Sequence, residues 1–87
     1  MRYTIELERP AEKFILKLPR SEQERVLRAL RGLPGAGDVK ALKGQRTRGL
    51  FRLRVGGYRV IYRIDHGRLV VLVMDAGARG DIYKRYG

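Results

Sequence analysis

The stretch FRLRVGGYRVIYRI, residues 51–64, carries the strongest structural signal in this chain of 87 residues. Apolar and charged residues alternate on either side of a Gly-Gly pair, which is typical of two antiparallel strands joined by a two-residue turn. We expect a positive φ at both glycines, since a turn of this kind requires it. The pairing that follows brings Arg54 opposite Arg59 and puts Arg52 on the same face.

Three arginines of this hairpin, Arg52, Arg54 and Arg59, therefore carry like charges on one face of the sheet. Like charges directly opposite each other across a strand pair are destabilising. An anionic ligand would offset the repulsion; alternatively, the flexible side chains splay apart into water at little cost. Arginine suits the first interpretation because its planar guanidinium group holds phosphate oxygens bidentately and stacks on bases.

Patterns on both sides of the hairpin predict further elements. Apolar and polar residues alternate over residues 2–7, which indicates a first strand. Two amphipathic patterns follow, and they predict two short helices, the first over residues 10–18. Ser21 and Glu24 have the spacing of a capping box at the start of the second helix. The β-branched run of residues 69–74 predicts an interior strand.

Two segments lack such periodicity: residues 35–49, which we expect to form a basic loop, and the polar, glycine-rich residues 75–87. The predicted fold class is therefore α+β, with an N-terminal strand, a two-helix hairpin and then a three-stranded antiparallel meander. Both helices are expected to pack on one face of the sheet. The length suits a single domain over residues 1–87.

The net charge of +11 favours a polyanionic partner. Residues 40–68 contain nine Lys or Arg and a single acidic residue, Asp65, so the charge is concentrated there. Apolar stretches are far shorter than the roughly 20 residues that span a bilayer, and no signal peptide is apparent, so we expect a cytoplasmic protein that does not bind membranes. With no cysteine and one histidine, His66, we expect neither a metal site nor a cofactor.

Several motifs together resemble the RelE/ParE toxin superfamily. They are Leu-Lys-Gly at residues 42–44, the hairpin of residues 51–64, the strand of residues 70–77, and then Arg79 and Tyr83. The resemblance extends over nearly the whole chain. It implies a RelE/ParE-like toxin of a type II toxin–antitoxin system, held in a hetero-oligomeric complex by a cognate acidic antitoxin.

The RelE-like branch of this superfamily is similar to ribosome-dependent endoribonucleases, which cut mRNA by attack of a 2′-hydroxyl on the adjacent phosphate. The resemblance then implies catalytic roles for Arg59, Arg79 and Tyr83. The residues expected to bind RNA are Arg52, Arg54, Lys43, Arg46 and Arg48. Arg52 and Arg54 stand where the best-known nucleases of the group have lysine, which keeps a phosphate-binding role but not proton donation.

Cleavage also requires proton transfer, and the chain has no pair of histidines and no Glu/His site that the patterns bring together. Tyr83 is the candidate base, and the guanidinium groups around it would have to favour its phenolate. Tyr86 follows closely and is an alternative. Two other functions also remain open: inhibition of DNA gyrase, as in the ParE-like branch, and RNA or ribosome binding without cleavage.

Overall fold

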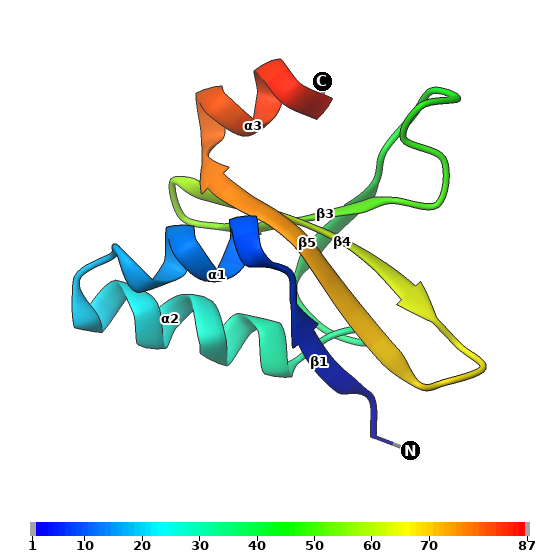
Figure 1. Cartoon of the computed structure of the whole chain (residues 1–87), viewed down its shortest axis with the longest axis horizontal. Coiled ribbons are helices and arrows are strands. Elements are labelled where there is room, and N and C mark those ends of the chain that lie inside the picture. Colours follow the sequence, from blue (N-terminus) through cyan, green and yellow to red (C-terminus); the bar gives the residue numbers. More distant parts are fainter. Residues whose placement is uncertain (1, 87) are drawn as a thin grey trace.

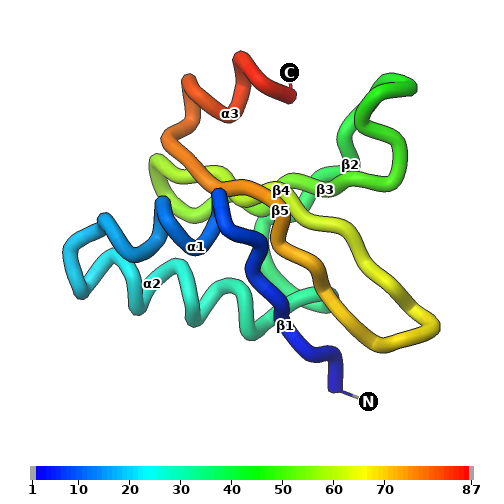
Figure 2. Tube along the Cα trace, viewed as in Figure 1, coloured from blue at the N-terminus to red at the C-terminus, as the bar shows by residue number. Residues whose placement is uncertain are grey.

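The computed structural model describes residues 2–86 and contains a mixed sheet of five strands (Figure 1). In chain order the elements are β1 (Thr4–Leu7), α1 (Arg9–Leu16), α2 (Arg20–Arg31), β2 (Asp38–Ala41), β3 (Phe51–Val55), β4 (Tyr58–Asp65), β5 (Val70–Ala78) and α3 (Arg79–Tyr86). The strand order across the sheet is β1-β5-β4-β3-β2. Figure 2 shows α1 and α2 running side by side below the sheet, with α3 on its other side.

The hairpin of β3 and β4 has the register that the sequence predicts. Arg54 lies opposite Arg59, and Arg52 lies opposite Ile61. Of the two turn glycines only Gly56 has a positive φ, of 58°, so the expectation for the second glycine is wrong. Glycine at the first of the two turn positions is the requirement of a type II′ turn.

The sheet is larger than the expected three-stranded antiparallel meander. β1 pairs with β5 in parallel, which makes the sheet mixed and β5 an interior strand, as its apolar sequence predicts. β2 lies in the segment expected to be loop and pairs antiparallel with β3. The prediction of a loop is therefore wrong for these four residues. The sequence gives little sign of the strand, because β2 is a short edge strand in which Val39 alone is half-buried. Its hydrogen bonds to β3, rather than its own propensity, define it as a strand.

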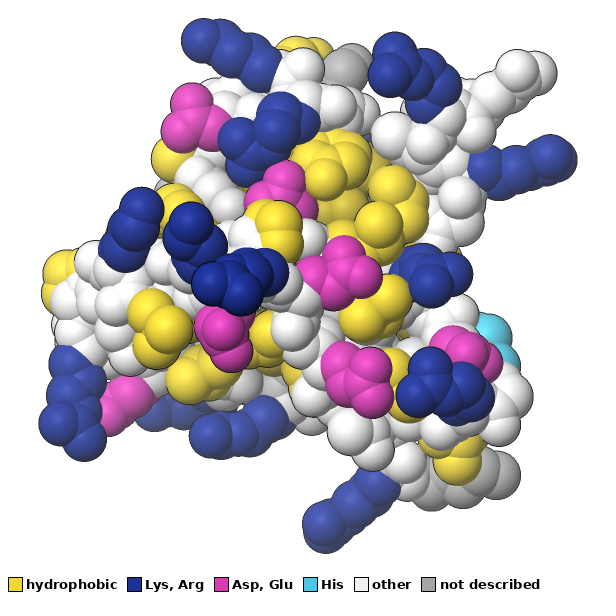
Figure 3. All heavy atoms as spheres, viewed as in Figure 1, with side chains coloured by type: hydrophobic (Ala, Val, Ile, Leu, Met, Phe, Trp, Pro, Cys, Tyr) yellow, Lys and Arg dark blue, Asp and Glu magenta, His cyan; other side chains and the backbone are white. Residues whose placement is uncertain are grey.

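α1 and α2 cover one face of the sheet, as predicted. The buried core contains Ala11, Ile15, Val26, Leu30, Leu33, Leu53, Val55, Val60, Tyr62, Val71, Val73 and Ala76. α2 begins at Arg20 after Pro19 and has no side-chain cap, so the capping box predicted at Ser21 does not form. Figure 3 shows basic and acidic side chains interspersed over these two helices, which is the pattern of an ordinary solvated surface.

The C-terminal residues form α3 rather than an irregular end. α3 buries a single residue, Ile82, and its other side chains are polar or aromatic, so no amphipathic pattern predicts it. It lies on the face of the sheet opposite α1 and α2 (Figure 1). Within residues 2–86 no helix combines the length and apolar character that crossing a membrane requires.

Candidate functional site

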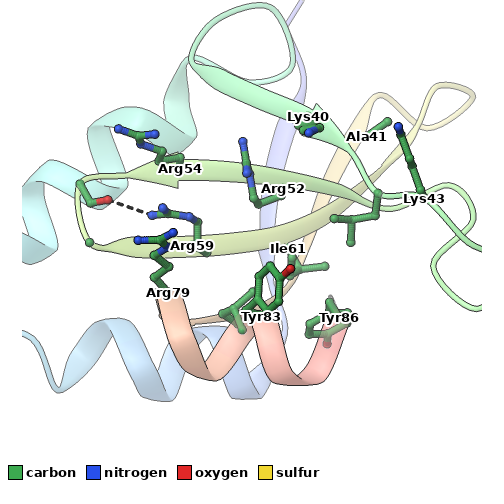
Figure 4. A pocket seen from close by; sticks show the side chains of 14 residues that line it. Lys40, Ala41, Lys43, Arg52, Arg54, Arg59, Ile61, Arg79, Tyr83 and Tyr86 are labelled. Atoms are coloured by element: carbon green, nitrogen blue, oxygen red, sulfur yellow. Dashed lines mark hydrogen bonds between the residues drawn. The ribbon is translucent and has the colours of Figure 1, made fainter.

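A cleft of about 710 Å³ lies between α3 and the face of the sheet that does not contact α1 and α2. β2, β3 and β4 form its floor, and α3 forms one wall (Figure 4). Strand alternation explains its composition, because Leu53 and Val55 point into the core while Arg52 and Arg54 point the other way. The basic side chains that line it are Lys40, Lys43, Arg52, Arg54, Arg59 and Arg79.

Arg59 is the most restrained of these side chains. It is only 9% exposed, and its Nη1 donates hydrogen bonds to the carbonyl oxygens of Gly56 and Tyr58, each at 2.9 Å. Burial lowers the pKa of the Arg59 guanidinium, and the like charges of Arg54, Arg52 and Arg79 lower it further. The cleft therefore concentrates positive charge around a guanidinium group whose position is fixed by the hairpin turn.

Asp38 supplies a negative charge next to the arginine cluster of the cleft, which consists of Arg52, Arg54, Arg59 and Arg79. Its carboxylate oxygens lie 3.7 Å from Nη2 of Arg52 and 3.5 Å from Nε of Arg54. Among residues 2–86 it is the only carboxylate paired with Arg52, Arg54, Arg59 or Arg79. The Nε of Arg52 is buried, and it has no hydrogen-bond partner among residues 2–86. The cluster thus retains both uncompensated charge and an unused donor.

α3 brings two further predicted residues to the cleft. The backbone N–H of Arg79 donates to the carbonyl oxygen of Gly57 at 3.0 Å, so the helix starts directly on the β3–β4 turn. Tyr83 lies one turn later and lines the same cleft as Ile61 and Arg52, with its ring pointing from α3 toward the strands (Figure 4). The Tyr83 side chain is 71% exposed, which leaves both its ring and its hydroxyl accessible from the cleft.

Tyr86 also lines the cleft but has a different environment. Its hydroxyl donates to Oδ2 of Asp75 at 3.1 Å. Burial raises the pKa of the Tyr86 phenol, and the Asp75 carboxylate raises it further. Both effects favour the protonated phenol, and its hydroxyl is already bonded to Asp75.

Six of the eight residues predicted for the site line this cleft together. They are Lys43, Arg52, Arg54, Arg59, Arg79 and Tyr83. Arg46 and Arg48 are exposed on the loop between β2 and β3, outside the cleft lining. His66 is also elsewhere, with its Nδ1 2.8 Å from the Tyr3 hydroxyl.

Sequence reasoning missed Asp38, Asp75 and the two isoleucines of the cleft, Ile61 and Ile82. Lys40 was part of the predicted basic loop, but only its place on β2, two residues from Asp38, turns it toward Arg52. A period-two pattern in residues 38–41 could have indicated this, had the segment been treated as a strand. Ile82 occupies the space left by the missing side chain of Gly77. A Cβ added at Gly77 would lie 3.2 Å from Cγ1 of Ile82.

Residues 5–83 match the family model described as the ParE toxin of type II toxin–antitoxin systems, parDE. Similar solved structures include the RelBE2 toxin–antitoxin complex from Mycobacterium tuberculosis, at 25% identity over 91% of this chain and 100% of that chain, with a TM-score of 0.71. A chain of the archaeal RelE–RelB complex from Pyrococcus horikoshii is 27% identical over 92% of this chain and 98% of that one, with a TM-score of 0.72.

The intact RelBE toxin–antitoxin complex of E. coli has a chain that is 24% identical, and the match covers 87% of this chain and 95% of that chain. Its TM-score of 0.68 shows that the two share a fold. No curated protein sequence matches the chain.

Proposed function

The chain belongs to the ParE toxin family of type II toxin–antitoxin systems, within the RelE/ParE superfamily, and from this premise we propose that it is a ribosome-dependent endoribonuclease of the RelE kind. The observation that carries the proposal is the cleft itself. Four guanidinium groups and an exposed tyrosine line it, and one carboxylate, that of Asp38, pairs with two of these guanidinium groups. A bound phosphodiester would neutralise the positive charge of Arg52, Arg54 and Arg59, and the base next to it can stack on Tyr83.

In the proposed reaction Tyr83 acts as the phenolate, favoured by the guanidinium groups of the cleft, and accepts the proton of a ribose 2′-hydroxyl. The 2′-oxygen attacks the adjacent phosphorus, the bond to the 5′-oxygen breaks, and the products are a 2′,3′-cyclic phosphate and a 5′-hydroxyl. Arg59 and Arg79 bind the charge that develops on the phosphate oxygens, a role for which fixed donors are effective. The leaving oxygen takes its proton from water, since guanidinium groups do not release one. The hydroxide that remains removes the proton from Tyr83 and restores its starting form.

The remaining basic residues have a binding role in this proposal. Arg52, Arg54 and Lys43 hold the phosphates on either side of the cut. Arg46 and Arg48, outside the cleft, contact ribosomal or messenger RNA further away. Contacts of this kind position the nucleic acid and carry little sequence information.

We also propose an acidic antitoxin as the partner that restrains this toxin. The RelBE2 structure that resembles the chain is a toxin–antitoxin complex, and the archaeal structure is a complex of RelE with RelB. A cleft this basic attracts an acidic segment. Induction of the toxin alone should arrest growth, and co-expression with a small acidic protein encoded beside it should restore growth. Normal growth at high expression of the toxin alone would contradict a toxic activity.

The decisive experiment compares Tyr83→Phe with the wild type in a translation reaction, where cuts in a reporter mRNA are mapped by primer extension. Tyr83→Phe should bind ribosomes with near-normal affinity and cut more slowly by a factor on the order of 10²–10⁴, the usual contribution of a general base. Arg79→Ala should slow cleavage roughly 10²–10³-fold and weaken binding as well. Tyr3→Phe is the matched control, because the Tyr3 hydroxyl contacts His66 away from the cleft.

Inhibition of DNA gyrase is the second candidate function, and the ParE description of the matching family model favours it. A gyrase inhibitor has no need of the Tyr83 hydroxyl. Supercoiling assays on the wild type and Tyr83→Phe therefore separate the two functions. Equal inhibition by both proteins, with no cuts in translated mRNA, would assign the toxin to gyrase, whereas RNA binding with neither activity would indicate a non-catalytic module.

A further inference from the structure

We propose that Asp75 is a positioning residue, a buried carboxylate that holds α3 across the cleft and thereby sets the place of Tyr83. This inference rests on the proposed function, in which Tyr83 is the base. It concerns a residue that the sequence patterns do not single out, on a strand that contributes Val73 and Ala76 to the core. Three features carry it: an irregularity in β5, the contacts of the carboxylate, and the scarcity of other anchors on α3.

A β-bulge turns Asp75 toward the cleft. Ile61 pairs with Asp75 and Tyr62 pairs with Val73, so Met74 has no partner in the register. In a regular strand Asp75 would share the face of Val73, which is in the core. The extra residue reverses the alternation and places Asp75 on the same face as Ile61, under α3.

The carboxylate is nearly buried and fully engaged. Asp75 is 8% exposed, and its Oδ1 accepts a hydrogen bond from the backbone N–H of Ala76 at 2.8 Å. Its Oδ2 accepts from Nε of Arg85 at 3.0 Å and from the hydroxyl of Tyr86 at 3.1 Å. A buried charge is costly unless it is paired and hydrogen-bonded. Here two of the three donors, Arg85 and Tyr86, come from the last turn of α3.

α3 has few other attachments to the sheet. Ile82 is its only buried residue, and it packs where Gly77 has no side chain. At its start the Arg79 N–H bonds to the Gly57 carbonyl oxygen. An isolated helix of eight residues is unstable in water, so its order depends on these contacts. Tyr83 lies between the two ends, and loss of the Asp75 contacts would leave it attached on one side only.

The test measures helix order and catalysis separately in the full-length toxin. Asp75→Asn removes the charge that pairs with Arg85 while keeping the side-chain shape, and Arg85→Gln removes the same pair from the exposed side. Asp65→Asn is the matched control, because Asp65 also accepts a backbone N–H, from Arg68 at 3.0 Å, but at the far end of β4. Amide hydrogen exchange reports on residues 83–86, whose N–H groups bond within the helix.

Both Asp75→Asn and Arg85→Gln should speed exchange at residues 83–86 at least about tenfold, since hydrogen bonds to a charged group are among the stronger ones. Single-turnover mRNA cleavage should fall on the order of 10–100-fold, because a small misplacement of a reacting group costs about that much. Ribosome affinity should stay within about twofold, since Asp75 and Arg85 are not phosphate contacts in this account. Asp65→Asn should match the wild type in all three measurements.

Wild-type exchange in both variants would overturn the proposal, and so would undiminished cleavage by a variant whose helix exchanges faster. If Asp75→Asn fails to fold, Arg85→Gln alone gives the answer, since Arg85 is half exposed and its loss opens no cavity in the core. If the wild-type protein cuts no RNA, the proposed nuclease function is refuted, but the role of Asp75 in holding α3 is not. The exchange measurement still decides whether Asp75 holds α3.

Discussion

The salt dependence of RNA binding tests whether the arginine face of β3 binds phosphates. Each phosphate that a side chain neutralises on a single strand steepens the fall of log K with log salt by about 0.7. Replacing Arg52 and Arg54 by glutamine should therefore flatten the slope by about 1.4. A fourfold rise in salt then weakens wild-type binding roughly sevenfold more than it weakens the variant.

Fluorescence anisotropy with a short single-stranded RNA gives this slope directly. A 2′-O-methyl RNA should be used, because it lacks the 2′-hydroxyl and is not cut during the titration. The matched control is Arg28→Gln with Arg31→Gln, which removes the same formal charge from exposed positions of α2 outside the cleft. That control should keep the wild-type slope, apart from a small change due to long-range charge.

Two results would refute the reasoning. If the Arg52 and Arg54 variant keeps the wild-type slope, the arginine face of the hairpin does not contact phosphates. If the α2 control flattens the slope equally, binding follows the overall charge of +11 and not the cleft.

Three further predictions follow from the same geometry. Asp38→Asn should tighten RNA binding by up to about fivefold in the anisotropy assay, because it removes an exposed counter-charge from Arg52 and Arg54; weaker binding would mean that Asp38 mainly orders the arginines. Leu53→Ala should lower the free energy of unfolding by about 2–5 kcal/mol in urea titrations, since Leu53 is 1% exposed in the core. Burial raises the pKa of the Tyr62 and Tyr86 phenols above their ordinary 10.0. The unfolded chain therefore ionises first, so the free energy of unfolding should fall as pH rises past about 10, and less so in Tyr62→Phe.

Family membership and most of the cleft could be predicted from the sequence because their signals are local. The Gly-Gly turn and the alternation around it determine which residues of β3 and β4 face each other, so Arg52, Arg54 and Arg59 were expected on one face, where they lie. Arg79 and Tyr83 were expected at the site from resemblance to a family, and α3 brings them to the same cleft. Their catalytic roles stay a prediction.

The parts that could not be predicted depend on partners distant in the sequence. β2 exists because β3 offers it hydrogen bonds. β1 lies parallel to β5 because α1 and α2 carry the chain to the opposite edge of the sheet, from which β2, β3, β4 and β5 lead back to β1. Alternation can indicate that each segment is a strand, but it does not identify the partner strand or its direction. The capping box predicted at Ser21 was wrong for a local reason, because the chain enters α2 at Pro19 and Ser21 is already inside the helix.

The sequence by itself determined the hairpin, the two amphipathic helices and the concentration of positive charge, because each arises from residues a few positions apart. Only the tertiary structure decided which side chains surround that charge and form the cleft. The bulge at Met74 reverses the alternation of β5, and Asp75 then faces Arg85 and Tyr86 rather than the core. Those contacts order a helix whose own sequence stabilises it little, and that helix completes the cleft beside Arg59.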